Sequence, residues 1–365
     1  MKRILIIRLS SIGDVIHATP VASSLKAAWP DCHITWLVGE VCAPLLQHNP
    51  AIDEMIVWPR EHFDAALRRG NLPRAWRVWQ GLKRKLASRQ FDIVLDIHGL
   101  LLTGLITRTV KARRKIGLST AGEGNPYFMT ETAAPRGGHI IDKYLGVLAA
   151  LGISGVKRPM TLIVPEAARR FAGQFLRQEG VLRQDKVVIL IPGTTWPSKN
   201  WPVPYFAAVA RALAGDLRVV LCGGKQEFAL SRMIAAQAGV ALINATGRTG
   251  LLEMAALLER AAVVVSGDTG PLHMAAALGI PTVAVFGPTD PAVYGPEGNK
   301  HVRLSARLPC SLCHKRRCPK NTMHCMSSVQ PITVIQAVYR LLEVTPAGMA
   351  NNPAGRRYGM KRIGM

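Results

Sequence analysis

The sequence has few acidic residues, few aromatic residues and no long hydrophobic run. Asp and Glu number 23 against 46 Lys and Arg, which leaves a net charge of +23 over 365 residues, and aromatic residues make up 6%. No stretch reaches the roughly 18 uninterrupted apolar residues of a membrane-spanning helix, so no transmembrane segment is expected. The shortage of carboxylates predicts an anionic partner, such as nucleic acid, an acidic membrane face or a phosphorylated substrate.

Several short patterns that would assign the chain to other classes are also missing. No G-x-G-x-x-G follows the first strand, and neither G-x-x-x-x-G-K-[ST] nor Asp-x-Asp occurs, which disfavours dinucleotide, P-loop and metal–diphosphate chemistry. No nucleic-acid-binding motif occurs, so nucleic acid is not the expected partner. The first apolar run is too short for a secretion signal and is followed by Arg8. Seven cysteines, an odd number, give no complete disulfide framework and predict a cytoplasmic protein.

Apolar strands and helical stretches alternate along the whole chain. The strands are rich in Val, Ile and Leu without clean alternation, as expected of strands buried on both faces of parallel sheets. Repeated βα units of this kind predict an α/β fold with doubly wound sheets. The expected strands are 3–8, 33–38, 54–58, 92–96, 187–191, 218–222, 241–244, 262–266 and 282–286, and the clearest expected helices are 19–28, 75–87, 204–214 and 271–278.

The length of the chain predicts two domains rather than one long sheet. We expect an N-terminal domain at 1–170 and a C-terminal domain at 185–330, joined by a helix and linker within 164–186. An amphipathic helix is expected at 331–345, followed by a basic, poorly ordered tail at 346–365. In open α/β sheets, ligands bind outside the carboxyl ends of the strands, so the loops after each strand are the places to search for a site.

The strongest site signal in the second half follows the strand at 262–266. Asp268, Thr269 and Gly270 form a tight turn into a helix, whose N-terminal N–H groups can bind a phosphate. His273 lies one turn further and can face the same anion. The alternative is that Asp268 is only a helix N-cap.

Two further loops on the same edge carry groups that suit a nucleotide diphosphate. Thr194, Thr195 and Lys199 follow the strand at 187–191, and these hydroxyls and the ammonium can hold and neutralise a diphosphate. Glu227 follows Gly223-Gly224 and can accept hydrogen bonds from a ribose diol. The alternatives are a solvated loop lysine and an ordinary glutamate at a helix N-terminus.

The combination of motifs resembles glycosyltransferase family 9, the lipopolysaccharide heptosyltransferases. The similar stretches are S-S-I-G-D-V-I-H-A-T-P after the first strand, T-T-x-x-x-K-x-W-P, D-T-G-x-x-H and F-G-P-T-D-P, within a resemblance that runs from residue 1 to about 345. The segment 91–108 and the Thr194-Thr195 pair are most similar to the heptosyltransferase I type. The resemblance implies a GT-B fold, in which two Rossmann-like doubly wound domains face each other across a cleft.

The resemblance also implies an activity and roles for individual residues. It implies inverting transfer of L-glycero-D-manno-heptose from ADP-heptose to Kdo of the lipid A–Kdo inner core, with no cofactor required. Asp14 would be the base that takes the proton from the attacking hydroxyl, unless it is a plain helix cap, and Lys199 would stabilise the leaving diphosphate. Ser10, Ser11 and Gly13 would lie on the acceptor side. The implied ADP-heptose site consists of Thr194, Thr195, Lys199, Glu227, Asp268, Thr269, Gly270 and His273.

The basic charge is concentrated in the first half. Residues 60–120 contain 14 Lys and Arg against four Asp and Glu. Trp76, Trp79 and Leu86 are expected roughly on one face of a basic helix, which either docks an anionic lipid acceptor at the cytoplasmic face of the inner membrane or packs on the sheet. Arg60 and His62, just past a strand, are further acceptor-side candidates.

A cluster of four cysteines stands near the C-terminus. Cys310, Cys313, Cys318 and Cys325 are spaced C-x2-C-x4-C-x6-C, which predicts either a structural Zn or Fe site or a loop with reduced thiols. Two other functions stay open on sequence grounds. One is a family 9 glycosyltransferase that adds a later heptose or another sugar to a different acceptor. The other is a non-catalytic protein that binds a nucleotide or a polyanion.

Overall fold

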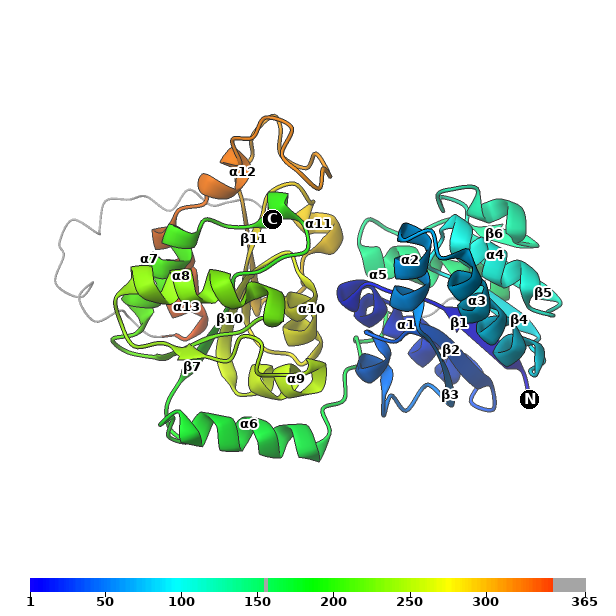
Figure 1. The fold of residues 1–365 in the computed structure, drawn as a ribbon, viewed down its shortest axis with the longest axis horizontal. Helices are drawn as coiled ribbons and strands as arrows, with labels where there is room; N and C mark the ends of the chain where they lie inside the picture. Colours follow the sequence, from blue (N-terminus) through cyan, green and yellow to red (C-terminus); the bar gives the residue numbers. More distant parts are fainter. Residues whose placement is uncertain (154–156, 344–365) are drawn as a thin grey trace.

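The computed structural model describes residues 1–153 and 157–343, so the predicted tail and the last two residues of the helix expected at 331–345 lie outside the described residues. It contains two six-stranded parallel sheets, one in each half of the chain (Figure 1). The first sheet consists of β1 (Arg3–Ile7), β2 (His33–Gly39), β3 (Glu54–Trp58), β4 (Ile93–Asp96), β5 (Arg114–Leu118) and β6 (Glu131–Ala133). The second consists of β7 (Val187–Ile191), β8 (Arg218–Leu221), β9 (Ile243–Asn244), β10 (Ala261–Gly267), β11 (Thr282–Phe286) and β12 (His301–Ser305).

Both sheets have the same strand order, which confirms the predicted doubly wound α/β architecture. The first runs β3-β2-β1-β4-β5-β6 and the second, read from its other edge, runs β9-β8-β7-β10-β11-β12. In each sheet the order reverses between the first and fourth strands of the half, β1 and β4 or β7 and β10. Such a reversal is where ligands bind in open α/β sheets, so the topology alone indicates where each half places a site.

Helices cover both faces of each sheet. On one face of the first sheet lie α1 (Ile12–Ala28) and α5 (Ile140–Leu145), and on the other lie α2 (Arg60–Arg68), α3 (Leu72–Ala87) and α4 (Leu101–Thr109). On one face of the second sheet lie α6 (Glu166–Gln178), α9 (Leu251–Glu259) and α10 (Gly270–Ala277), and on the other lie α7 (Val203–Leu213), α8 (Phe228–Ala238) and α13 (Pro331–Leu341). Two short helices, α11 (Pro291–Tyr294) and α12 (His324–Ser327), follow β11 and precede α13.

Strand β1 shows why these strands read as continuous apolar runs. Ile4 and Ile6 pack toward α1, whereas Leu5 and Ile7 pack toward α3, and all four side chains are fully buried. Successive side chains of a strand point to opposite faces, so a sheet covered on both faces needs an apolar residue at every position.

The first helix begins earlier than the sequence predicts. We expected a helix at 19–28, but α1 begins at Ile12 and includes Pro20. Proline lacks the N–H that would bond to the carbonyl of Ile16. The hydroxyl of Thr19 donates to that carbonyl instead, at 2.7 Å, which allows the helix to continue through the proline.

Three strands at or near the edges of the sheets escaped prediction. They are β5, β6 and β12, whose sequences RKIGL, ETA and HVRLS are short or carry charged residues. Edge strands are only partly buried, so their sequences need not be apolar throughout. The other strands and the helices α3, α7, α10 and α13 lie within a few residues of their predicted positions.

Helix α6 occupies the predicted linker region. It packs against α9, and Arg169 makes two hydrogen bonds of 2.8 and 2.9 Å to the carboxylate of Glu259. The predicted domain boundaries, with the first domain ending at 170 and the second beginning at 185, stay a prediction. Helix α6 runs through residue 170 and packs on the second half of the chain. In the described ranges 1–153 and 157–343, no helix has both the length and the apolarity needed to cross a membrane.

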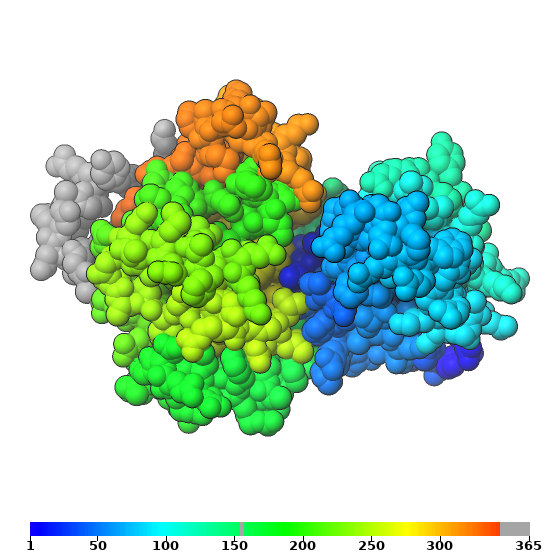
Figure 2. All heavy atoms as spheres, viewed as in Figure 1, coloured from blue at the N-terminus to red at the C-terminus, as the bar shows by residue number. Residues whose placement is uncertain are grey.

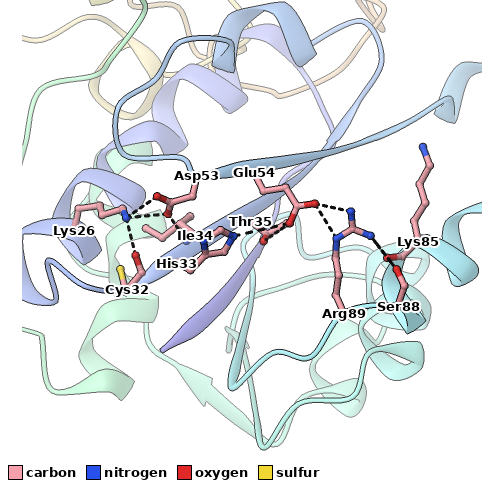
Figure 3. A network of polar contacts seen from close by, with 10 residues as sticks. All are labelled: Lys26, Cys32, His33, Ile34, Thr35, Asp53, Glu54, Lys85, Ser88 and Arg89. Carbon is pink, nitrogen blue, oxygen red and sulfur yellow. Dashed lines mark hydrogen bonds and ion pairs between the residues drawn. The ribbon is translucent and has the colours of Figure 1, made fainter. Parts of the chain in front are cut away.

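One edge of the first sheet is held by charged pairs that satisfy each other (Figure 3). Lys26 of α1 lies 2.8 Å from the carboxylate of Asp53, and the guanidinium of Arg89 donates to Glu54 at 2.9 Å. These contacts connect the ends of α1 and α3 to the start of β3. Because every charge there has a partner, we interpret this network as structural.

The two halves contact each other along one boundary, which Figure 2 shows between the blue and the yellow-green surfaces. Helix α1 of the first half packs against α10 of the second. Lys157 adds an ionic link, because its ammonium contacts both Asp142 and Glu297. His139 also contacts the backbone carbonyl of Gly295 at 3.1 Å.

Replacing Ile6 by Ala tests the packing of the first sheet. Ile6 is fully buried between β1 and α1, so we expect the variant to lose about 2–5 kcal/mol of unfolding free energy in a urea titration. The conservative control Ile6→Val should lose only about 0.5–1.5 kcal/mol. Equal stability of Ile6→Ala and the wild type would contradict the described packing.

Candidate active site in the interdomain cleft

A cleft of about 540 Å³ lies between the two halves. The loops after β1, β7 and β10 line it, at the carboxyl ends of strands beside the two reversals of strand order. Most of the predicted site residues line this one cleft, namely Ser10, Ser11, Gly13, Asp14, Arg60, Thr195, Lys199, Asp268, Thr269, Gly270 and His273. The structure therefore brings together residues as far apart in the sequence as Ser10 and His273, which are separated by 263 positions.

Asp14 lies in the first turn of α1 on the first-half wall of the cleft. Its carboxylate forms an ion pair of 2.8 Å with Arg8 and accepts hydrogen bonds from the hydroxyls of Tyr144, at 2.7 Å, and Ser11, at 2.9 Å. The carboxylate also faces the backbone N–H of Ser11 in a capping box. Asp14 is thus both a helix-capping residue and a carboxylate of the cleft, and its side chain remains 29% exposed.

The surroundings of Asp14 keep it ionised. Burial by itself would raise the pKa of this carboxyl, but the neighbouring guanidinium of Arg8 and the hydrogen bond from Tyr144 outweigh it and hold the pKa well below its usual range. Burial raises the pKa of Tyr144, so this phenol stays protonated and donates. Asp14 is therefore a fully charged hydrogen-bond acceptor near neutral pH.

Asp268 lies on the opposite wall, directly after β10. Its carboxylate contacts the ammonium of Lys199 at 2.6 Å and accepts a hydrogen bond of 2.7 Å from the hydroxyl of Thr289. Burial would raise the Asp268 pKa, but His273 and Lys199 hold it well below the usual range. The N-cap of α10 is Thr269 and not Asp268, so the N-cap interpretation of this carboxylate is wrong.

Lys199 and the start of α10 form an anion site. The lysine side chain is only 13% exposed and its ammonium lies 4.4 Å from the ring centroid of Trp196, so it is not a solvated loop lysine. Helix α10 begins at Gly270, and Thr269 makes no side-chain capping hydrogen bond. Pro271 has no N–H group, and the N–H of Leu272 donates to the carbonyl of Thr269 at 3.1 Å. The N–H groups of Thr269 and Gly270 are therefore the ones that remain available to a phosphate beside the ammonium.

Two histidines connect the walls of the cleft. Nε2 of His17 in α1 lies 3.1 Å from Nδ1 of His273 in α10, and Nε2 of His273 lies 3.4 Å from Asp268. The ionised Asp268 only accepts hydrogen bonds, so His273 donates through Nε2 and, when neutral, accepts from His17 through Nδ1. Burial and the neighbouring His273 keep the His17 pKa well below its usual value. His17 is thus a neutral donor across the boundary between the halves.

Two glycines make this close approach possible. A Cβ on Gly13 would lie 2.6 Å from a ring carbon of His273, and a Cβ on Gly270 would lie 2.7 Å from the side chain of Ile12. Real Cβ atoms do not approach other atoms so closely, so any larger residue would push α1 and α10 apart. Gly13 therefore makes room for the second half of the chain in addition to lying in the cleft.

Three predicted site residues do not line the cleft. The hydroxyl of Thr194 contacts Asn200 at 2.7 Å within its own loop. Glu227 lies against Gly193, where a Cβ would come within 2.1 Å of it, so the loops after β7 and β8 meet at this glutamate. His62 is exposed on α2.

Three partners of the predicted carboxylates have no signal in the sequence. Arg8 ends the first apolar run, and Tyr144 lies in α5, 130 positions from Asp14, with no local pattern to mark it. Thr289 lies in the F-G-P-T-D-P stretch, where nothing local pairs its hydroxyl with Asp268. His98 also lines the cleft, and burial together with Arg8 lowers its pKa to about 3.

The segment that carries the cysteine cluster forms part of the cleft wall. The Ser198 hydroxyl donates to the carbonyl of Lys315 at 2.6 Å, and the N–H of His314 donates to the carbonyl of Pro288 at 2.8 Å. His314 and Arg316 line the cleft as a result. This segment, coloured orange in Figure 1, thus adds a cation to the side of the cleft that holds Lys199.

The four cysteines lie near one another, since Cys310, Cys313 and Cys318 add to the burial that raises the pKa of Cys325. Cys325 is buried and the other three are partly exposed. A tetrahedral zinc site would bring its sulfur atoms within about 4 Å of one another. Among the residues that the structure describes, the group of three metal-type ligands within 4.8 Å of one another is His139, Asp142 and Glu297. Lys157 already supplies the positive charge there.

Replacing Tyr144 by Phe removes one hydrogen bond from Asp14 and should raise its pKa toward about 3.9. A carboxyl whose pKa is lower in the folded than in the unfolded state stabilises the fold above its unfolded pKa, and this stabilisation is lost as the pH falls through the folded pKa. We expect the variant to be less stable by about 2 kcal/mol at pH 7 in urea titrations, because the bond involves a charged group.

The pH dependence of this difference separates the hydrogen bond from a packing effect. Protonation of Asp14 in the unfolded state is the same in both proteins and cancels in their difference. The difference between wild type and Tyr144→Phe should therefore shrink only as the pH falls through the folded pKa of Asp14 in the variant, which lies above the wild-type value and no higher than about 3.9. A variant whose folded Asp14 pKa, followed by NMR, equals that of the wild type would contradict the hydrogen bond to the ionised carboxylate.

Comparison with known proteins assigns the chain to a family. Residues 79–324 match glycosyltransferase family 9 (heptosyltransferase). The chain is 28% identical over 331 residues to lipopolysaccharide heptosyltransferase 1 of Pseudomonas aeruginosa, covering 87% of each chain. It is 26% identical over 343 residues to a lipopolysaccharide heptosyltransferase 3 of Escherichia coli, covering 92% of this chain and 98% of the other.

Solved structures confirm the predicted GT-B fold. A family 9 glycosyltransferase from Veillonella parvula superposes with a TM-score of 0.82 at 26% identity, over 94% of this chain and 97% of the other. E. coli heptosyltransferase WaaC with ADP superposes with a TM-score of 0.72 at 24% identity, over 93% and 99% of the two chains. With the family match over residues 79–324, these likenesses establish that the chain is an enzyme that belongs to glycosyltransferase family 9, the heptosyltransferases.

Proposed function

We propose that this enzyme transfers L-glycero-D-manno-heptose from ADP-heptose to Kdo of the lipid A–Kdo inner core, with inversion at the anomeric carbon. The observation that carries the proposal is the pairing of two walls in one cleft. An ionised carboxylate, Asp14, lies on the first-half wall, and an anion site at Lys199 and the start of α10 lies on the second-half wall. A base and a leaving-group site on opposite walls suit direct displacement between two bound substrates.

The donor would bind to the second half. Its diphosphate would lie between Lys199, Arg316 and the free N–H groups of Thr269 and Gly270, which together supply the positive charge that a diphosphate needs. The adenosine would extend toward Glu227, where the loops after β7 and β8 meet. The fold neighbour WaaC holds ADP, which supports ADP-heptose as the donor.

The acceptor would bind to the first half. Arg60 lines the cleft and donates to the hydroxyl of Ser10 at 2.6 Å, and His98 lies nearby in the same wall. Kdo is an acidic sugar, so its carboxylate would find a cation at Arg60. His62 is exposed on the same helix and would contact only the outer part of a large acceptor.

The transfer step balances without an added group. The acceptor hydroxyl oxygen attacks the anomeric carbon from the first-half wall, and its proton passes to the carboxylate of Asp14. The bond between the anomeric carbon and the β-phosphate oxygen breaks, and ADP leaves with the electron pair. Lys199 and the α10 N–H groups stabilise the charge that grows on the β-phosphate. We propose no cofactor for this step.

A low pKa does not disqualify Asp14 as the base. A carboxylate with a low pKa is a weak base toward a free hydroxyl, but the hydroxyl proton becomes acidic only as the new bond forms. The ion pair with Arg8 and the bond from Tyr144 keep the carboxylate ionised and fix its direction. Proton transfer then occurs late, when it is favourable.

The acceptor and the metal are the two least supported parts of this proposal. Relatives of similar identity are named heptosyltransferase 1 and heptosyltransferase 3, so identity does not select the acceptor. The basic first half and the heptosyltransferase I pattern favour Kdo. A related acceptor further along the core is the alternative. The structural Zn or Fe stays a prediction, which a metal assay on protein purified without added metal tests.

Replacing Asp14 by Asn tests the base while keeping the size and the capping hydrogen bond. We expect the kcat for ADP release to fall by about 10²–10⁴-fold, because proton transfer by a positioned base contributes this much. The Kd for ADP, measured by calorimetry, should change little, since Asp14 lies on the opposite wall from the anion site.

A matched control separates catalysis from capping. Ser11→Ala removes the hydroxyl that bonds to Asp14 but keeps the carboxylate and its ion pair with Arg8, so it should retain most of the activity. Undiminished transfer by Asp14→Asn would remove Asp14 from the mechanism. A non-catalytic binding protein would show ADP binding and no transfer in any variant, the wild type included.

A further inference from the structure

An apolar groove of about 350 Å³ opens on the surface of the first half, between α2, α3 and α4. Its rim contains Leu67, Leu72, Trp76 and Leu105, whose side chains are 46%, 65%, 61% and 38% exposed. Its floor contains Phe63 and Trp79. Clustered exposed side chains of this size are unusual on a monomer and mark a surface that contacts another apolar phase.

The two tryptophans of α3 differ in how they are packed. Trp79 packs against Phe63 and Trp58, with ring centroids 6.2 and 6.5 Å away, and Leu86 is buried beneath the helix. Trp76 lies one turn earlier and remains on the surface. Trp76 and Trp79 line the same groove, whereas Leu86 is buried, so packing on the sheet accounts for Leu86 but not for Trp76.

The helices that form this groove also carry unpaired cations. Arg68, Arg69, Arg74, Arg77 and Arg108 are all exposed on α2, α3 and α4 or the turns beside them. None of them forms an ion pair with a carboxylate in the described parts of the chain. Exposed apolar side chains and guanidinium groups on the same helices match the interface of an anionic bilayer, where acyl chains lie beneath negative head groups.

The groove is also close to the acceptor side of the cleft. Helix α2 begins at Arg60, which lines the cleft, and reaches the groove at Leu67, about 10 Å further along at 1.5 Å per residue. Leu100 lines the cleft, and Leu105 of the adjoining α4 lines the groove. In Figure 1, α2 and α3 lie on the near side of the first sheet, with α2 toward the boundary between the halves.

We propose that this groove docks the enzyme on the surface of an anionic phospholipid bilayer, with Trp76 and Leu72 inserted at the level of the head groups. The docking would hold the cleft about one head-group layer from the membrane, where the sugar of a lipid-anchored acceptor lies. This purpose rests on the proposed function, but the docking itself requires neither donor nor acceptor.

Vesicle binding tests the proposal directly. We would measure sedimentation of the full chain with phosphatidylcholine vesicles that contain phosphatidylglycerol, and with phosphatidylcholine alone. The wild type should bind the anionic vesicles, and Trp76→Ser and Leu72→Ser should each weaken binding by about tenfold or more, since both apolar area and charge contribute. The control Ile332→Ser removes an apolar side chain that is 48% exposed on α13 in the second half, and it should bind as the wild type does.

Fluorescence places the contact at one residue. Trp76 is the tryptophan with a highly exposed side chain among the described residues. Its emission should shift to shorter wavelength on anionic vesicles, and the shift should be absent in Trp76→Phe. Arg77→Gln and Arg68→Gln should weaken binding at low salt and reduce its salt dependence.

Other outcomes would overturn the proposal. Equal vesicle binding by Trp76→Ser and the wild type would exclude the groove as the docking surface. Self-association of the wild type that Trp76→Ser abolishes, without vesicle binding, would assign the groove to a second copy of this chain. Transfer to a detergent-dispersed acceptor should be the same for Trp76→Ser and the wild type. If neither protein transfers the sugar but the wild type still binds vesicles, the proposed function is wrong and the docking proposal is retained.

Discussion

The site depends on keeping two carboxylates charged within one cleft. Asp268 is buried and Asp14 is partly buried, and burial alone would favour their protonated forms. Each has its own cation on its own wall, Arg8 for the first and Lys199 for the second. Each carboxylate and its cation belong to the same half of the chain, so each wall of the cleft neutralises its own carboxylate.

The contact between α1 and α10 determines how close the two walls of the cleft lie to each other. Gly13 and Gly270 let the two helix N-termini approach, and the hydrogen bond between His17 and His273 joins them. Asp268 therefore contacts both the anion site and, through His273, the helix that carries Asp14.

The sequence was sufficient for the elements whose signals are local. The ends of β1, β7 and β10 could be predicted because apolar runs stop at polar residues and glycines, and this placed Asp14, Lys199 and Asp268 at one edge. Partners that only tertiary structure supplies could not be predicted. No sequence pattern near Tyr144 indicates that it contacts Asp14. The side chains of Thr194 and Glu227 lie outside the cleft because of the path of their loops, which the sequence does not specify. The first half of α1 could not be predicted because Pro20 usually marks the start of a helix. The hydrogen bond from the Thr19 hydroxyl to the backbone, which lets the helix continue through Pro20, has no sequence signal.

In the proposed reaction, the cleft transfers a heptosyl group with inversion onto a Kdo acceptor. To test it, the wild-type enzyme would be incubated with ADP-L-glycero-D-manno-heptose and Kdo2–lipid A, and the mass and the anomeric configuration of the product would be determined. We expect a product heavier by one heptosyl residue, formed in step with ADP and inverted at the anomeric carbon. ADP release without a heptosylated product, or a product with retained configuration, would contradict it.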